Sequence, residues 1–528
     1  MFNISNFRCV AASILRATSS AEVPIVQFII EPVLLLSTSS LVQDPALDSL
    51  LALLKEMMIS NAMDFADLYT FLHAKISLQT GKHGVHNLSK CIAVITANST
   101  VESKQSVLKD ILSVLKGSTT PTDNMDIKKV HLSLLISGDL GRMVDLLTVS
   151  ESASQLLGIY VEYFDSPLEE VKNAAAYALG NVAVCSSSTF LPSIVEQLET
   201  GEKKHTYLLL SALREFIIHR FRNADTSEGM STNLNMIVPA LELFCSDEEE
   251  GVRTMVAECL GALTCQQPNI MLPKLEQWLR AHSTTEVGES KANALVSWTI
   301  VSAVKLAIAG KVDASLLGLS MPTFVEMLHH KDVSVRHASL LLIYSAVHHM
   351  PIAISSLMKD DIMTSLYEIA KLKLERKVDL GPFTHTVDDA LPLRKAALSI
   401  FSTCMENVPG SVNASEFIVV LVKALGDAED MQLHAHQILI AMCSRQPSYI
   451  VTALDSFVEP LEKTMNKKPG DKTGTELDRL NDWIKSALRV MLAMSKLDGC
   501  MNSNKFSDFN ERIKSNSKFT ALLASIED

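Results

Sequence analysis

Apolar residues recur every three to four positions along almost the whole chain, with charged residues between them. This spacing places apolar side chains on one face of a helix, so the pattern predicts helices nearly from end to end. One unit recurs within it: an acidic helix start, an aliphatic–basic pair, then small residues and leucines. The pairs are Val171-Lys172, Val252-Arg253, Val335-Arg336, Leu393-Arg394, Leu433-His434 and Ile484-Lys485.

The spacing of these pairs defines the repeat. Successive pairs are 81, 83, 58, 40 and 51 residues apart, which fits a unit near 40 residues with two insertions. Paired helices with a period of about 40 residues are typical of HEAT and armadillo repeats. For 528 residues we expect an all-α solenoid of about thirteen helix pairs.

Local signals fit this expectation. The sequence Ser166-Pro167-Leu168-Glu169 predicts a helix cap, a proline at the first helical position and a capping-box glutamate. Small residues from Ala174 to Gly180 should let that helix pack closely against its neighbours. The acidic run Asp247–Glu250 could suggest a cation site. Acidic residues at a helix start also complement the helix dipole, and we favour that interpretation.

The period breaks around Arg376–Asp389, where about 18 residues exceed the repeat unit of about 40. Alternating β-formers flank a Gly-Pro break, so this segment predicts one inserted β-hairpin. An isolated hairpin is marginally stable in water, which favours a partner-binding projection, but a hairpin folded back onto the helices fits equally well. Its residues are Val378, Asp379, Leu380, Gly381, Pro382, Phe383, Thr384, His385, Thr386, Val387 and Asp388. Two other insertions, Ser283–Lys291 and Asn466–Thr475, look like polar surface loops.

Composition narrows the function classes. The chain has 20 Gly, 17 Pro and 5% aromatic residues, which argues against an all-β fold, and 47% hydrophobic residues argue against disorder. A net charge of −13 without a basic stripe disfavours nucleic acid as a partner. The nine cysteines form no C-x-x-C pair and predict reduced thiols in a cytoplasmic or nuclear protein.

No segment predicts membrane binding or export. The apolar stretch Val23–Leu36 is too short to cross a bilayer and contains Glu31 and Pro32. Met1–Ser20 has two arginines, several serines and no acidic residue, a faint resemblance to a transit peptide, but we favour one amphipathic helix.

Motifs for chemistry are isolated. Asp471-Lys472-Thr473-Gly474-Thr475 matches the phosphorylation motif of P-type ATPases, yet it lies in a polar loop without the required strand or membrane helices. Histidines cluster at His329-His330, His348-His349 and His434/His436, but adjacent helical histidines point about 100° apart and cannot share one metal. We therefore expect no enzyme activity, no metal and no cofactor.

Several stretches resemble the cullin-associated and neddylation-dissociated protein family. The most specific is LGPFTHTVDDALPLRKAA at Leu380–Ala397, since its hairpin sequence is not a general HEAT feature. The others are Ser166–Ile217, Gly251–Thr264, Ile300–Ile308, Ile127–Gly141 and Phe457–Thr464. The resemblance covers most of this chain but only the C-terminal part of a family member, including the TATA-binding-protein-interacting C-terminal domain.

The resemblance implies a function. Family members wrap a cullin–RING scaffold that lacks its ubiquitin-like modifier, and a hairpin in their C-terminal repeats occupies the surface used by substrate adaptors. On matching residues the contacts would be Leu380, Pro382, Phe383, His385 and Val387. Adaptor and chain would then bind antagonistically and permit receptor exchange without a covalent step. A different HEAT scaffold, such as a nuclear transport receptor or phosphatase scaffold, is the alternative.

The chain also departs from the family pattern. Thr384 stands where the family usually has lysine, Ala390 where it has glycine, and Ser283–Lys291 is an added loop. The resemblance and the repeats together predict three parts: a HEAT solenoid at 1–340, a C-terminal HEAT domain with the hairpin near 376–389 at 341–515, and a tail at 516–528.

Overall fold

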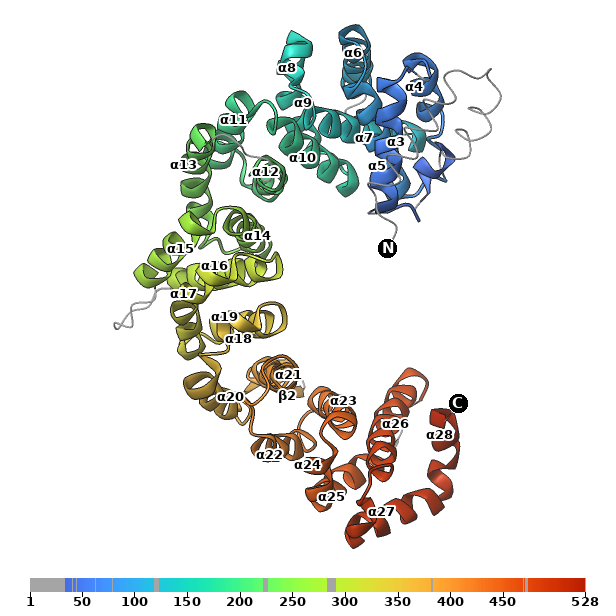
Figure 1. Ribbon diagram of the computed structural model, residues 1–528, viewed down its shortest axis with the longest axis vertical. Helices are drawn as coiled ribbons and strands as arrows, with labels where there is room; N and C mark the ends of the chain where they lie inside the picture. The colour runs from blue at the N-terminus through green and yellow to red at the C-terminus, as the bar shows by residue number, and fades with distance from the viewer. Residues whose placement is uncertain are drawn as a thin grey trace. The chain divides into compact units, whose positions relative to one another are not determined.

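The computed structural model confirms an all-α repeat fold with one inserted β-hairpin (Figure 1). It describes residues 34–527 except 40, 44, 62, 78, 118–122, 222–226, 283–290, 381–382, 469 and 471–472. The described residues contain 26 α-helices, α3 to α28, which agrees with about thirteen helix pairs. The chain divides into two compact units, Met1–Gln266 and Gln267–Asp528. The predicted boundary at residue 340 stays a prediction.

Within its described residues, the first unit contains helices only. Its elements are η1 (Leu36–Thr38), α3 (Pro45–Ile59), α4 (Phe65–His73), α5 (Lys82–Ala97), α6 (Val101–Gly117), α7 (Asn124–Gly141), α8 (Leu146–Val149), η2 (Glu151–Gln155), α9 (Leu156–Tyr163), α10 (Glu169–Ala183), α11 (Ser187–Thr200), η3 (Lys203–His205), α12 (Thr206–Arg220), α13 (Ser227–Phe244) and α14 (Glu250–Gln266). Within it, α7 packs against α5 and α10, and α12 packs against α10 and α14.

The second unit carries the hairpin. Its elements are α15 (Pro268–His282), α16 (Lys291–Ala309), α17 (Ala314–Val325), η5 (Glu326–His329), α18 (Val333–His349), α19 (Pro351–Ile354), η6 (Met358–Ile362), α20 (Met363–Ile369), β1 (Glu375–Leu380), β2 (Phe383–Asp388), α21 (Leu391–Asn407), α22 (Ala414–Ala424), α23 (Glu429–Arg445), α24 (Pro447–Thr452), α25 (Leu454–Met465), α26 (Thr475–Ser495), η7 (Cys500–Asn502), α27 (Asn504–Ser515) and α28 (Ser517–Glu527). Helix α18 packs against α16 and α21, and α23 packs against α21 and α26.

The predicted period is confirmed within each unit. In the first unit α5, α7, α10, α12 and α14 begin at residues 82, 124, 169, 206 and 250. In the second, α16, α18, α21, α23 and α26 begin at residues 291, 333, 391, 429 and 475. We call these ten the inner helices. The one long step, from 333 to 391, contains the hairpin.

Small residues set the contacts between inner helices, as predicted. A Cβ atom added to Gly138 of α7 would lie 2.8 Å from Cα of Ala178 in α10, and one added to Gly180 of α10 would lie 2.1 Å from the Ala212 carbonyl oxygen in α12. Both distances are shorter than non-bonded atoms allow. The inner helices of the first unit therefore approach closely only because glycine occupies these positions.

A buried carboxylate joins three of these helices. Asp139 in α7 is fully buried. Its oxygens accept hydrogen bonds of 2.7 Å from the hydroxyls of Ser89 in α5 and Tyr177 in α10. Arg142, one turn further along α7, pairs with the same carboxylate at 3.2 Å. Because each partner satisfies part of the buried charge, the network fixes how α5, α7 and α10 stack.

Two sequence predictions about the repeat were wrong in detail. Helix α10 begins at Glu169, and the Ser166 hydroxyl accepts from the Leu168 amide at 3.3 Å, so it forms a turn before the helix and not the predicted cap. The basic members of four pairs stand fourth in their helices, at Lys172, Arg253, Arg336 and Arg394, but His434 stands sixth in α23 and Lys485 eleventh in α26. Gln432 is the fourth residue of α23. The pairs Leu433-His434 and Ile484-Lys485 therefore have the aliphatic–basic sequence pattern but do not occupy the same helix position as the other four pairs.

Two segments differ from their predicted character. Residues 517–527 form helix α28, with Phe519 fully buried, so the predicted C-terminal tail is largely helical. Helix α16 is long and apolar enough to cross a membrane by length and composition alone, a property that the sequence reasoning overlooked, and just over half of its apolar window is buried. Burial against α15 and α18 is what a repeat core requires of such a helix. Residues 1–33, and with them Met1–Ser20, lie outside the described residues.

The eight described cysteines form no disulfide with one another. Six of the eight are buried, Cys265 is half-buried and Cys185 is exposed. Burial raises the pKa of Cys91 and of Cys245 to about 12. These two thiols therefore stay protonated and act as small apolar core residues.

Buried histidines predict an acid-sensitive fold. Burial lowers the pKa of His436 in α23 to about 4, against about 6.5 in an unfolded chain. Protonation therefore favours the unfolded state, and this stability is complete above pH 6.5 and lost as the pH falls toward 4. We expect a loss on the order of 1–2 kcal/mol between pH 6.5 and pH 5. His436→Gln should reduce the accompanying fall in melting temperature.

The exposed His348 provides the control. His348→Gln should follow the wild-type dependence of melting temperature on pH. An equally steep fall in His436→Gln and the wild type would contradict the assignment of this acid sensitivity to His436.

Candidate functional site

The predicted hairpin exists and lies between α20 and α21. Strands β1 and β2 are antiparallel, and the cross-strand pairs run from Glu375↔Asp388 at the base to Leu380↔Phe383 at the tip. Gly381 and Pro382, which connect the strands, lie outside the described residues. The alternating β-formers thus determined the local structure correctly, although helices surround them in the sequence.

The register divides the hairpin into two faces, because alternate pairs of a two-stranded ribbon share a face. One set of pairs is Arg376–Val387, Val378–His385 and Leu380–Phe383, and it is mainly apolar. The other set is Glu375–Asp388, Lys377–Thr386 and Asp379–Thr384, and it is entirely polar. Four of the five predicted contact residues belong to the apolar set, and the fifth, Pro382, is in the connection. An amphipathic ribbon of this kind suits an apolar partner surface.

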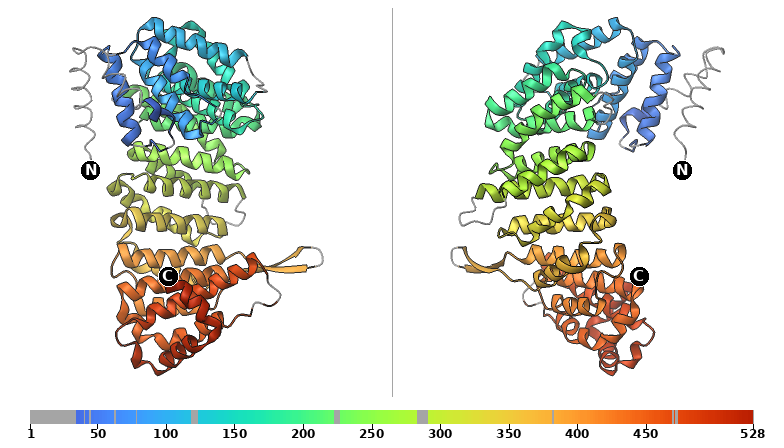
Figure 2. Two further views of the ribbon diagram at one scale, coloured as in Figure 1. Left: turned by 90° about the vertical axis from the view of Figure 1, so that its right-hand side faces the viewer. Right: turned by 60° about the vertical axis from the view of Figure 1, so that its left-hand side comes forward.

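The hairpin projects away from the helices. In Figure 2 its two strands extend past the side of the second unit, and the ribbon is covered by no helix in either view. The described residues Arg376, Lys377 and Thr386 are exposed, and the apolar Val387 is 38% exposed. The alternative that the hairpin folds back onto the helices is therefore wrong.

The base of the hairpin is closed by Asp388. One carboxylate oxygen, Oδ1, accepts hydrogen bonds from the amides of Leu374 at 2.9 Å and Ala390 at 3.1 Å. The Asp389 amide also donates to the Leu374 carbonyl at 3.1 Å. These bonds join the residue before β1 to the residues after β2. The base is thus closed by the protein itself and needs no partner.

The second Asp388 oxygen reaches the buried Arg394. Nη1 of Arg394 donates to Oδ2 of Asp388 at 2.6 Å and to the Leu372 carbonyl at 2.7 Å. Nε and Nη2 donate to the two oxygens of Asp427 at 2.8 and 3.0 Å, a bidentate pair. Arg394 lies in α21 and is 1% exposed, and Asp427 precedes α23. We call Asp388, Arg394 and Asp427 the base cluster.

Charge pairing keeps the base cluster ionised. Burial raises the pKa of the Asp388 carboxyl, but the two amide hydrogen bonds and Arg394 outweigh burial and hold that pKa below its ordinary value. Burial likewise lowers the pKa of Arg394, and its bonds to Asp388 and Asp427 outweigh that effect and raise it. Both groups are therefore charged at neutral pH, and each depends on the other for a partner.

Sequence reasoning missed this role of Arg394, which it treated only as a repeat residue. Arg253 stands at the same helix position in α14, and its guanidinium donates to the carbonyls of Asp247 and Glu248 in its own repeat. Lys172 in α10 pairs with Glu169 of its own helix. A usable signal was present, because Asp388 and Asp389 precede Arg394 by only six and five residues in the sequence.

The other sequence candidates form no site in the described part of the chain. No group of three or more metal-ligating side chains occurs among those residues. In the acidic run at the start of α14, the Asp247 carboxylate accepts a hydrogen bond from the Glu249 amide at 2.8 Å. This bond is local to the start of the helix. His348 and His349 contact each other edge to face, and Asp471 lies outside the described residues.

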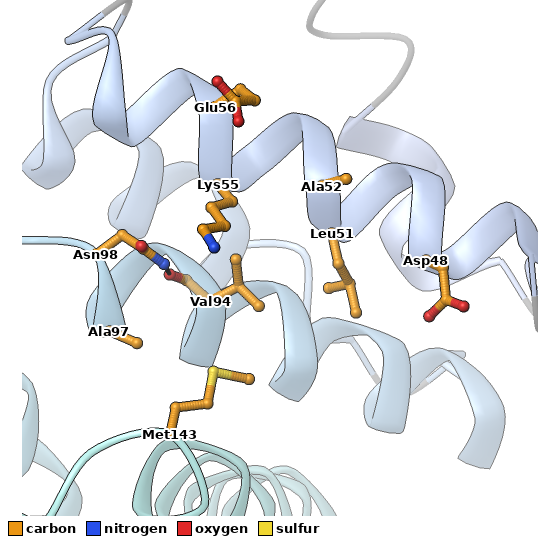
Figure 3. A pocket seen from close by; sticks show the side chains of 9 residues that line it. All are labelled: Asp48, Leu51, Ala52, Lys55, Glu56, Val94, Ala97, Asn98 and Met143. Carbon is orange, nitrogen blue, oxygen red and sulfur yellow. Dashed lines mark hydrogen bonds between the residues drawn. The ribbon is translucent and has the colours of Figure 1, made fainter. Parts of the chain in front are cut away.

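The first unit has a surface cavity of about 590 Å³ (Figure 3). Helices α3 and α5 and the residue Met143 line it. Its lining residues are Asp48, Leu51, Ala52, Lys55, Glu56, Val94, Ala97, Asn98 and Met143. Asp48 and Lys55 lie two turns apart on α3, and Figure 3 draws no hydrogen bond between them. The lining offers no paired acid and base aimed at a common point, so it gives no catalytic constellation.

Comparison with known proteins identifies relatives of this chain. A family described as TATA-binding protein interacting (TIP20) matches residues 354–514, which include the hairpin and base cluster. The chain is 34% identical over 82% of its length to cullin-associated NEDD8-dissociated protein 1 of Arabidopsis thaliana, and covers 34% of that protein. It is 32% identical over 94% of its length to the protein of the same name from Dictyostelium discoideum, covering 39%.

A further relative and two solved structures agree with this picture. Cullin-associated NEDD8-dissociated protein 2 of Mus musculus is 29% identical over 88% of the chain, which covers 36% of that protein. The chain thus spans between a third and two fifths of the length of these curated relatives. The solved structure of the Kap95:Nup1 complex matches 97% of this chain and 62% of its own chain. The TM-score is 0.53 and the sequence identity is 11%. The structure of yeast importin-beta matches 91% of this chain and 59% of its own chain, with a TM-score of 0.50 and 11% sequence identity.

At 11% identity the two importin-type structures establish the repeat fold alone. The sequence relatives establish more, because their identity extends along most of the chain and one from Emericella nidulans is named as a C-terminal part. Over most of its length the chain is therefore similar to proteins named cullin-associated NEDD8-dissociated protein, one of which is named as a C-terminal part.

Proposed function

We propose that this chain is a non-enzymatic assembly factor of cullin–RING ubiquitin ligases. It binds an unmodified cullin together with its RING subunit, and it competes with the substrate adaptor for the cullin surface. The projecting hairpin carries this proposal, because no helix covers its strands in Figure 2 and it lies within the part of the chain that the family model matches. The names of the relatives support the cullin as partner.

Competition alone is sufficient for receptor exchange. If hairpin and adaptor occupy one surface, each weakens the binding of the other by the same coupling free energy. A typical coupling changes affinity by about 5–150-fold, which accelerates exchange without any bond being made or broken. Such a mechanism needs no catalytic constellation.

The proposal extends to partners and location. The net charge of −13 and the absence of a basic stripe support a protein partner and not nucleic acid. The described cysteines form no disulfide, which supports a reducing compartment, so we propose a location in cytoplasm and nucleus, without a membrane partner. The importin-like fold does not favour a transport function, since this fold serves many unrelated partners.

A competition experiment with purified proteins tests the proposal. An immobilised unmodified cullin–RING complex should retain the chain, and saturating adaptor–receptor module should raise the apparent Kd of the chain by at least about fivefold. The same complex carrying the ubiquitin-like modifier is the second arm, and it should retain less chain. Retention unaffected by the adaptor would contradict the proposal, and so would the absence of binding to unmodified cullin.

A further inference from the structure

The hairpin is attached to the second unit by very few described contacts. Its strands pair with each other, its residues Arg376, Lys377 and Thr386 are exposed, and no helix covers it (Figure 2). Because its two strands are held together only by each other, such a ribbon can rotate about its base as a rigid body. The direction in which it projects is therefore set where β1 and β2 join the helices, and the base cluster lies at this point.

The exposed ion pair at the base is a weak constraint. Arg376 and Asp389 pair at 2.6 Å, but their side chains are 60% and 38% exposed. Water competes for both groups, and such pairs contribute little. Bonds from Asp388 to Leu374 and Ala390 close the base of the ribbon but do not tie it to another repeat.

Arg394 makes the connection to the helices. Its guanidinium bonds both sides of the hairpin base, through the Leu372 carbonyl and Asp388, and it also bonds Asp427 of the following repeat. The planar group has donors at fixed angles, so these three acceptors cannot rotate independently. Asp427 is itself held, because its backbone carbonyl accepts from Gln432 at 2.8 Å. The Gln432 side chain accepts in turn from Thr464 of α25 at 2.8 Å.

Stability of the fold alone does not explain the base cluster, because burying these charges costs free energy. Removing an arginine and two carboxylates from water costs several kcal/mol per ion, and apolar residues of similar size often stabilise as well or better. At the same helix position in α10, Lys172 pairs with Glu169 of its own helix. Arg394 differs by bonding two carboxylates outside its helix, one before and one after it in the chain. A role in orientation accounts for this difference.

We propose that Arg394 is the positioning residue of the hairpin, which it holds at a fixed angle to α21 and α23 through Asp388 and Asp427. This inference rests on the proposed function only where it concerns binding. A hairpin that samples many directions is oriented for binding during only a fraction of the time. The apparent affinity for the partner is then the intrinsic affinity multiplied by that fraction. The partner is the same apolar cullin surface that the adaptor uses.

Distances between spin labels test the position of the hairpin directly. Labels at cysteines introduced for Thr386 in β2 and Val419, which is 54% exposed in α22, report its direction relative to the helices. Cys9, Cys185 and Cys265 are replaced by serine in every sample. We expect one narrow distance distribution in the parent chain and a distribution at least about twice as wide in Arg394→Met, since several directions become populated.

The matched control is Arg376→Met, which removes an exposed ion pair from the same hairpin. It should keep the narrow distribution of distances. Arg394→Met should weaken the affinity for unmodified cullin–RING complex by about tenfold while far-ultraviolet circular dichroism is unchanged. If Arg394→Met loses helicity, Asp427→Asn replaces it, since it leaves the Arg394–Asp388 bond intact, and it should widen the distribution.

The outcomes separate the two proposals. A distribution as narrow as the parent's in the folded Arg394 or Asp427 variant overturns the positioning role, as does equal broadening by Arg376→Met. If the distribution widens but neither these variants nor hairpin removal affect cullin binding, the positioning role stands and the proposed binding function fails. If hairpin removal weakens binding and the widened variants bind like the parent, orientation has no part in recognition.

Discussion

Removing Val378–Val387 should abolish competition with the adaptor while leaving the helices intact. The residues removed contain nearly the whole apolar face of the hairpin, and with it the proposed contact surface. We expect the chain's effect on adaptor binding to fall below detection, a loss of at least about fivefold. The measurement is displacement of labelled adaptor from unmodified cullin–RING complex, with helicity followed by circular dichroism.

The register makes this deletion structurally conservative. Glu375 and Asp388 are the cross-strand pair at the base, so deleting the segment leaves Arg376 and Lys377 as a two-residue connection between them. Two-residue loops are the commonest hairpin connections, and Asn-Gly at these two positions would suit the turn best. Asp388 would then keep its bonds to Leu374 and to Arg394. A folded chain without its hairpin is therefore the expected product.

Substitutions on the two faces provide the matched control. Val378→Ser with Val387→Ser alters the mainly apolar set of pairs, and Lys377→Ser with Thr386→Ser alters the polar set on the same strands. Only the first pair should weaken competition. Equal loss from both pairs, or unchanged competition after the deletion, would contradict a role for the apolar face.

The repeat and the hairpin were predictable because each has a local signal. The 40-residue period follows from helix pairs that each bury one apolar face, and it appears in the sequence as recurring apolar spacing. The hairpin appears as a change of period from helix to strand at Val378. Both signals depend on residues close together in the sequence.

The predictions that failed concerned which side chains pair across repeats and where each helix begins. Arg394 and Asp427 are 33 residues apart, and nothing in the local pattern of either shows that they pair. The spelling Leu433-His434 imitated the repeat although Gln432 holds the equivalent helix position. Ser166 had the composition of a cap, but its hydroxyl forms a turn before the helix. The local sequence pattern thus predicted whether each segment is a helix or a strand. The partners of individual side chains were decided by the folded structure and were not predicted.

Gly180→Ala should destabilise the first unit by about 3 kcal/mol or more. The added Cβ would lie 2.1 Å from the carbonyl oxygen of Ala212 and 2.8 Å from Cβ of Glu215, both in α12. The carbonyl is part of the α12 backbone, so no side-chain rotation relieves the contact and α10 and α12 must separate. Because each repeat contacts only its neighbours, the loss should concentrate at this interface. Thermal unfolding should begin about 6–12 °C earlier.

Gly158→Ala in α9 is the matched control, with no atom within 4 Å of the added Cβ. Alanine favours helix over glycine by about 1 kcal/mol, so this variant should be slightly more stable than the parent. The same substitution is thus expected to act with opposite signs at two helical glycines that differ only in what lies beside them. A Gly180→Ala chain that melts with the parent would mean that α10 and α12 can separate by more than an ångström without loss, and that close approach at glycine does not set the spacing of the inner helices.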